Sequence, residues 1–186
     1  VTVAVLALTP PAVPDPPAAG EPVELPGGAG GIGFDDLQYS TALGRVLVPG
    51  GRAGRLYLLE PKTRAVSWIE GFSASPAFGG GHDDGVTSVA EAAGRLYATD
   101  RTALSLAVID PVSGKIVARA KLSAGPDHVR YVAPTREIWV TEPDADRIEV
   151  FRLADAADAA PVASGTIAVS KGPESLVVNV TRGRAY

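Results

Sequence analysis

Acidic side chains recur at one kind of position in this sequence, the loop that leads into a short apolar run. Each stands two residues before the first apolar residue of its run. The four residues are Asp35, Asp84, Asp127 and Glu174. Carboxylates that gather in one place raise one another's pKa and attract cations. The pattern therefore predicts a cation or polar-ligand site, with calcium as one candidate ion.

The two histidines add a second kind of chemistry. Imidazole can transfer protons or ligate metals, and His128 follows Asp127 directly, which makes it the candidate catalytic residue. His82 follows three glycines in a loop that could wrap around an ion. No second histidine stands at the local spacing of a zinc motif. The ligand-binding candidates are Asp84, Asp127, His128 and Glu174, and the metal candidates are Asp35, Asp84, Asp127 and Glu174.

A plainer interpretation of the acids stays open. Aspartate in such turns commonly accepts hydrogen bonds from backbone N–H groups of its own turn. One structural rule, repeated along the chain, would then account for all four acids. The histidines would line a surface and carry no chemistry.

The elements that must position these residues are short strands. The chain is rich in brief runs of Val, Ile, Leu and Tyr, bounded by Gly, Pro, Asp and Ser, which is typical of strands and tight turns. Four runs share a turn that ends in Arg or Glu: GRVLVP at Gly44, GRLYATD at Gly94, REIWVTE at Arg136 and GRAY at Gly183. They recur every 40 to 50 residues or so, which is the period of a four-stranded propeller blade.

Each of these runs is preceded by another, and the first three are followed by two more. The sequence therefore predicts an all-β fold, a β-propeller of four-stranded antiparallel blades. We expect blades at residues 37–71, 86–123 and 129–170, and an incomplete one at 176–186, within a partial propeller over 21–186. Residues 71–84 and 154–161 are expected loop insertions, and residues 20–26 a strand that closes the ring. Loops entering the innermost strands would open on the central channel, where the acids would meet.

The repeats resemble the YVTN family of β-propeller proteins over residues 37–186. The residues that carry this resemblance are 94–99, 106–117, 138–141 and 147–150, whereas residues 59–63 depart from the usual turn. The resemblance implies about half of a seven-bladed ring, with the remaining blades of the same polypeptide as a partner. It implies an exported binding or scaffold module that acts through loops on one face. The alternative is a hydrolase or lyase of the lactonase kind, with a metal- or histidine-dependent site at the channel.

The first twenty residues are interpreted as the remnant of an export signal and a Pro-rich linker. Residues 1–8 are an apolar run as long as a signal-peptide core; a first strand and a linker is the alternative. Export would place the protein in the periplasm, outside the cell or on its surface. Eight apolar residues fall short of the roughly 20 that a membrane span needs, so no transmembrane segment is expected.

Composition and one weak motif exclude further classes. The net charge of -4 leaves no basic stripe, so nucleic acid is not an expected partner, and the lack of cysteine removes disulfides and thiolate chemistry. Residues 28–33 match the dinucleotide-binding G-x-G-x-x-G. Pro26 and Gly27 break the strand-to-turn junction which that motif needs, and this favours a linker. No organic cofactor is expected, and the one cofactor considered is a divalent cation such as calcium.

Overall fold

The computed structural model describes residues 20–186, and its strands form three four-stranded sheets and one pair. The prediction of an export-signal remnant falls on residues 1–19, outside the described part. The first sheet holds β1 (Gln38–Ser40), β2 (Arg45–Pro49), β3 (Arg55–Leu59) and β4 (Val66–Glu70). The second holds β5 (Val86–Ala92), β6 (Arg95–Asp100), β7 (Ser105–Asp110) and β8 (Lys115–Lys121). The third holds β9 (Val129–Val132), β10 (Glu137–Glu142), β11 (Arg147–Arg152) and β12 (Val162–Ala168), and the pair is β13 (Val178–Asn179) with β14 (Arg184–Ala185).

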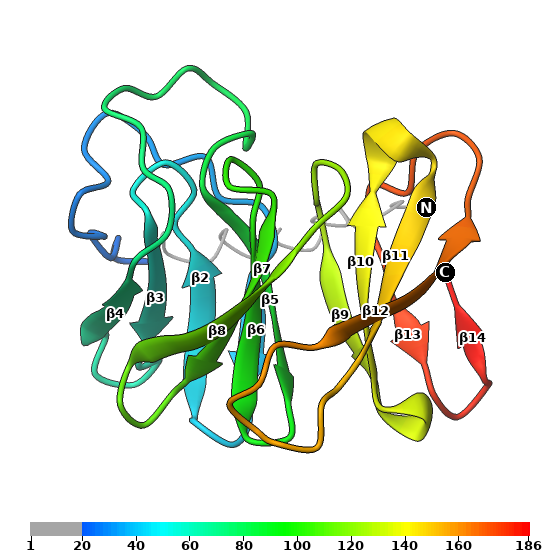
Figure 1. The fold of residues 1–186 in the computed structure, drawn as a ribbon. Helices are drawn as coiled ribbons and strands as arrows, with labels where there is room; N and C mark the ends of the chain where they lie inside the picture. The colour runs from blue at the N-terminus through cyan, green and yellow to red at the C-terminus, as the bar shows by residue number, and fades with distance from the viewer. Residues whose placement is uncertain (1–19) are drawn as a thin grey trace, which may run out of the picture.

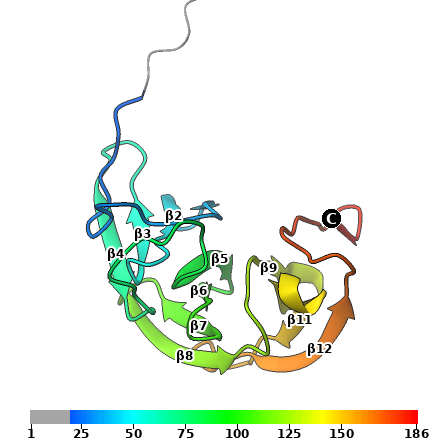
Figure 2. The same ribbon diagram turned by 90° about the horizontal axis from the view of Figure 1, so that it is seen from above.

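Each sheet is an antiparallel meander in which spatial order follows chain order. We call the three four-stranded sheets blades 1, 2 and 3. The blades stand side by side along an arc (Figures 1 and 2), with β8 and β12 on its outer rim and β5 and β9 on its inner side. The predicted all-β fold with four-stranded antiparallel blades is confirmed.

Burial explains why some strands are continuous apolar runs and others alternate. In blade 2, β6 and β7 are covered on both faces, and nearly every residue is buried. The rim strand β8 reads KIVARAK, with exposed and half-buried residues in turn. A strand covered on one face needs apolar side chains only at every second position.

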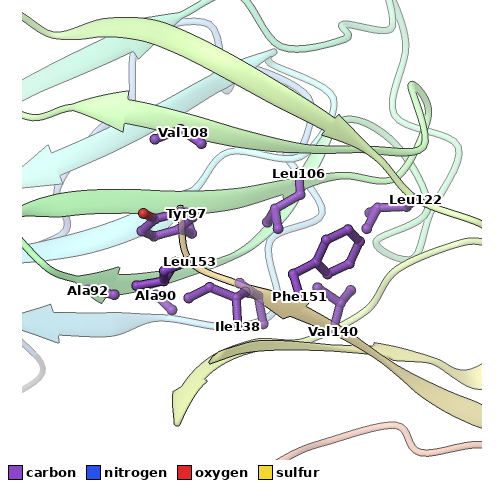
Figure 3. Packing of buried hydrophobic residues seen from close by; sticks show 11 residues of the cluster. Ala90, Ala92, Tyr97, Leu106, Val108, Leu122, Ile138, Val140, Phe151 and Leu153 are labelled. Carbon is purple, nitrogen blue, oxygen red and sulfur yellow. The ribbon is translucent and has the colours of Figure 1, made fainter. Parts of the chain in front are cut away.

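The hydrophobic core lies between blades rather than inside them. Between blades 2 and 3, Leu106 of β7 and Phe151 of β11 point into the same packed region (Figure 3), together with Leu122 and Val140. A second cluster joins blades 1 and 2 and includes Leu56 and Val89. Burying one such side chain stabilises the fold by about 1.5–3 kcal/mol. Each blade therefore depends on its neighbours for stability.

A buried acid at the end of the second strand ties blades 2 and 3 each to the blade before it. In blade 2, Asp100 accepts hydrogen bonds from the backbone N–H groups of Ser73 (2.7 Å) and Ala103 (3.0 Å). In blade 3, Glu142 accepts one from the N–H of Ala124 (2.9 Å). Ser73 and Ala124 stand at the same offset after the rim strands β4 and β8. The carboxylates thus fix the connection that leads from one blade to the next.

The first described residues bear on two interpretations of the sequence. The ring-closing strand expected at residues 20–26 stays a prediction, because no strand of a last blade is among the described residues for it to pair with. Residues 20–26 contain no strand. Residues 28–33 form turns that no helix follows, and two of their carbonyl groups accept hydrogen bonds from Arg52 at 2.6 Å. The only helical turns of residues 20–186 are η1 (Ala133–Thr135) and η2 (Pro143–Ala145). The dinucleotide interpretation is therefore excluded. Nothing helical in this part of the chain has the length and apolar character of a membrane span.

Candidate functional site

Polar side chains from three blades meet where the chain enters the inner strands. Asp35 lies in the segment before β1, His82 in the long loop before β5, and Asp127 and His128 in the segment before β9. We call these four residues the inner-loop cluster. Glycines at 79–81 precede His82, and Gly80 and Gly81 adopt positive φ angles of 93° and 66° that favour glycine.

The four side chains approach one another closely without forming tight pairs. His82 Nδ1 lies 3.6 Å from Asp127 Oδ1 and 3.8 Å from Asp35 Oδ2. His128 Nε2 lies 3.4 Å from Asp35 Oδ2 and 4.0 Å from Asp127 Oδ2. These distances exceed the usual 2.7–3.2 Å or so of a nitrogen–oxygen hydrogen bond. Only His128 and Asp35 are close enough for a long hydrogen bond, and the two histidines face different oxygens of Asp127.

Asp127 is the least satisfied member of the cluster. Its side chain is 2% exposed, and within residues 20–186 its buried Oδ1 has no hydrogen-bond partner. Burial raises the pKa of this carboxyl above its usual value, and the nearby charges of His128, His82 and Arg101 oppose that effect only in part. A carboxylate in this position gains from any cation that reaches it.

Asp36 lies beside the cluster, and both of its carboxylate oxygens accept hydrogen bonds. Arg130 donates two hydrogen bonds to it, at 2.6 and 3.0 Å, and Gln38 donates another at 2.7 Å. Ser88 also donates to Asp36 and in turn accepts the backbone N–H of Val129 at 2.9 Å. Burial raises the pKa of Asp36, but the hydrogen bonds from Arg130 and Ser88 outweigh it and hold the pKa below its usual value. We call these residues the Asp36 network.

His128 stands between the network and the cluster. Its Nδ1 lies 3.3 Å from Arg130 Nη2, and a guanidinium can only donate, so Nδ1 accepts. In the neutral imidazole the proton then resides on Nε2, which faces Asp35. His128 is therefore oriented to donate a proton or hydrogen bond toward the cluster.

Arg101 lies at the edge of the cluster as a shared counter-ion. Its guanidinium is 3.7 Å from Asp127, 3.4 Å from Asp83 and 3.9 Å from Asp144. Asp83 and Asp144 are largely exposed, and pairs of this kind contribute little. One arginine thus leaves the carboxylates around it in excess.

The structure brings together only part of the predicted set. Asp35, Asp127 and His128 meet, and their ligand atoms lie within 4.8 Å of one another. Neither Asp84 nor Glu174 forms a hydrogen bond or ion pair with them in the described part of the chain. Glu174 instead lines an apolar hollow beside Trp139.

Sequence reasoning missed the part that His82 plays. The loop of His82 was expected to be able to wrap around an ion, but no partner residue was assigned to the histidine; the structure sets it against Asp35 before blade 1 and Asp127 before blade 3. The plainer interpretation of Asp127 finds no support, because over residues 20–186 no backbone N–H of its turn donates to its carboxylate. The three glycines before His82 were the one available signal.

The geometry permits two kinds of chemistry. Two carboxylates and an imidazole whose ligand atoms lie within 4.8 Å of one another, with a second imidazole beside them, can hold a cation. A carboxyl of raised pKa next to an imidazole can also exchange protons with a bound molecule. Both uses need the loops of all three blades in place.

Comparison with known proteins identifies the fold of this chain. No family model matches the chain, and no curated protein matches it. Among solved structures, a chain of the mitotic checkpoint complex matches with a TM-score of 0.62 and 11% identity, over 80% of this chain and 43% of that one. Hydrazine synthase of Kuenenia stuttgartiensis matches with a TM-score of 0.58 and 14% identity, over 86% and 41%.

A third match is the periplasmic gluconolactonase of Pseudomonas aeruginosa, with a TM-score of 0.56 and 16% identity, over 73% of this chain and 40% of that one. The chain thus spans less than half the length of each of these three. Other matching chains are described as WD40 repeats and as a beta-propeller domain. Likeness at such low identity concerns architecture only. The chain therefore has the fold of part of a β-propeller, three four-stranded blades followed by a two-stranded sheet.

Proposed function

We propose that the protein is a binding module whose ligand site is the inner-loop cluster, and that the ligand carries positive charge. The observation that carries this proposal is the buried carboxylate of Asp127, which has an oxygen without a hydrogen-bond partner in residues 20–186. Buried polar groups are nearly always satisfied in folded proteins, and exceptions concentrate where a ligand or ion completes them.

The charge balance around Asp127 supports a cationic ligand. Asp127 faces one arginine, Arg101, at 3.7 Å, and the ion-pair partners of Asp35 are the histidines His82 and His128. The neighbouring Arg130 is already neutralised by Asp36. The excess of carboxylates favours a bound cation and disfavours an anion.

Calorimetric titration of the intact protein with putrescine, a small diamine, tests the cationic class directly. We expect binding that weakens at least about tenfold in Asp127→Asn, which corresponds to a lost charged contact of about 1.4 kcal/mol. Asp84→Asn is the matched control, since it removes an acid of the same loop type that lies outside the cluster. Equal affinity in both variants, or no binding of putrescine or of any metal cation, would refute the proposal.

A hydrolase is the second candidate, favoured by the raised pKa of Asp127 beside His128. The resemblance to the YVTN family and to a gluconolactonase in fold belongs to this alternative as well as to the binding module. Hydrolysis of gluconolactone, followed by acid release at constant pH, should then fall strongly in His128→Ala and persist in Asp84→Asn. Absence of hydrolysis in the intact protein would eliminate this candidate.

Export and additional blades complete the proposal. The apolar residues 1–8 and the Pro-rich stretch after them favour export to the periplasm, the cell surface or the medium. The neighbouring structures are more than twice as long as the matched part, which favours further blades in the same polypeptide. Cell fractionation of the intact protein tests the location; recovery with the cytoplasmic fraction would contradict export.

A further inference from the structure

Two buried atoms of the inner-loop cluster face each other without a bond. His82 Nδ1 and Asp127 Oδ1 are both buried, both lack a hydrogen-bond partner within residues 20–186, and lie 3.6 Å apart. The side chain of Asp127 is 2% exposed, so its oxygen cannot be satisfied by bulk water. An imidazole nitrogen and a carboxylate oxygen placed in this way offer two lone pairs to the same point.

The spacing of the cluster matches the spacing of metal ligands. Two ligands at about 2.1 Å from a tetrahedral zinc ion lie about 3.4 Å from each other. The separations between cluster atoms from different residues are 3.4, 3.6, 3.8 and 4.0 Å. Only the 3.4 Å contact of His128 with Asp35 is short enough for a long hydrogen bond. The ligand atoms of Asp35, Asp127 and His128 already lie within 4.8 Å of one another, and His82 would join them by a movement of its glycine-rich loop.

The type of donor selects the ion. Calcium and magnesium prefer shells made of oxygen alone, whereas imidazole nitrogen suits zinc, copper and nickel. The cluster supplies two imidazoles and two carboxylates. Its donors therefore fit a divalent transition metal better than the calcium that the sequence indicated.

His128 is the weaker of the two histidine ligands. Metal binding at Nε2 requires that nitrogen to be free of its proton, and the other ring nitrogen then normally donates to an acceptor. Here that other nitrogen faces the donor Arg130 at 3.3 Å, which opposes the required tautomer. We therefore rank His82 above His128 as the imidazole ligand beside Asp35 and Asp127, although the three residues whose ligand atoms already lie within 4.8 Å of one another are Asp35, Asp127 and His128.

We propose that Asp35, His82 and Asp127 form a zinc-class metal site joining three blades, with His128 as a weaker fourth ligand. This inference rests on the proposed function, because it names the positively charged ligand of the same cluster. One ligand comes from the loop entering each blade, so a bound ion links segments that are 45 or more positions apart in sequence. Metal binding should accordingly raise the melting temperature of the intact protein.

The experiment is a calorimetric titration of the intact protein, freed of metal with a chelator, with zinc chloride alone. We expect binding that weakens in Asp127→Asn and His82→Ala by more than the roughly 10- to 100-fold that loss of an outer-shell group costs. His128→Ala should weaken it less. Asp84→Asn and Glu174→Gln are matched controls and should leave zinc affinity unchanged. Cobalt(II) in place of zinc should give the intense visible absorption of a four-coordinate ion, and His82→Ala should remove it.

Circular dichroism of each variant separates loss of the site from loss of the fold, and His82→Gln replaces His82→Ala if the latter unfolds. Zinc binding that survives both Asp127→Asn and His82→Ala would overturn the assignment. Putrescine binding that depends on Asp127, without zinc binding, would overturn the metal inference and leave the proposed function standing. Absence of both would refute the two together.

Discussion

Asp36 and Asp127 are two buried acids at the inner ends of the blades, and they differ in almost everything else. Asp36 accepts hydrogen bonds from Arg130, Ser88 and Gln38, and its pKa lies below the usual value. Asp127 has an oxygen without a hydrogen-bond partner in the described chain, and burial raises its pKa. The difference separates a region whose hydrogen bonds stabilise the fold from a neighbouring region that, on the proposed function, binds the ligand.

The largest change in folding stability is expected from disrupting the Asp36 network. Asp36→Asn removes the charge that Arg130 neutralises and leaves the guanidinium of Arg130 partly buried without its partner. Removing one member of a buried pair costs about 3 kcal/mol. The midpoint of chemical denaturation of the intact protein should fall accordingly. An unchanged midpoint would mean that this network does not stabilise the fold.

The corresponding substitution of the buried acid in the inner-loop cluster should stabilise the fold, whereas Asp36→Asn should destabilise it. Asp127→Asn in metal-free protein relieves the cost of burying a carboxylate whose oxygen lacks a partner. The free energy of unfolding should rise by about 1 kcal/mol, within the range seen when a functional residue is replaced by a stabilising one. The same denaturation measurement applies. Destabilisation like that of Asp36→Asn would show that Asp127 has a structural role.

The pH dependence of the two variants should separate them further. The pKa of Asp36 is lower in the folded state, so its contribution is present above the unfolded value of about 3.9 and is lost as pH falls through the folded value. The pKa of Asp127 is higher in the folded state, so its favourable contribution exists at low pH and is lost as pH rises from about 4. Melting temperatures from about pH 3 to about pH 7 should show the penalty of Asp36→Asn shrinking toward low pH and the gain of Asp127→Asn growing toward neutral pH. If the melting temperatures of the two variants changed with pH in the same way, the proposed difference between Asp36 and Asp127 would be wrong.

The smallest effect is expected at the exposed edge of the cluster. Asp144 approaches Arg101 at 3.9 Å, and its side chain is 85% exposed. Asp144→Asn should change the free energy of unfolding by less than about 0.5 kcal/mol, as surface pairs generally do. A larger loss of folding stability would mean that the pair of Arg101 and Asp144 also helps to hold the fold together.

Sequence reasoning was reliable for the blades because their signals are local. A strand such as β6, written RLYATD, is a short run rich in β-forming residues next to a Gly turn, and its partner follows a few residues later. The closing strand expected at residues 20–26 stays a prediction, because a single apolar pair, Val23 and Leu25, does not specify what it pairs with. Such a stretch needs a free edge to join, and that information is absent from the stretch itself.

The site was only half predictable for a related reason. The sequence suggested a ring of four acids because each stands two residues before an inner strand: Asp35, Asp84, Asp127 and Glu174. The length of each loop, however, decides which side chain reaches the cluster. In the long second loop the residue that arrives is His82, two positions before the expected Asp84. The pairing of Asp36 with Arg130 joins residues 94 positions apart, and no pattern within either strand reveals it.

The carboxylates of Asp100 and Glu142, which hold the connections into blades 2 and 3, have a consequence for how the molecule comes apart. Because each acid accepts a hydrogen bond from a backbone N–H of the preceding connector, one blade cannot detach without breaking a hydrogen bond to a buried carboxylate of the next. Mechanical load applied to one end should therefore be transmitted through the array, and the blades should yield together. We therefore expect the repeats to unfold in a single step and not one after another.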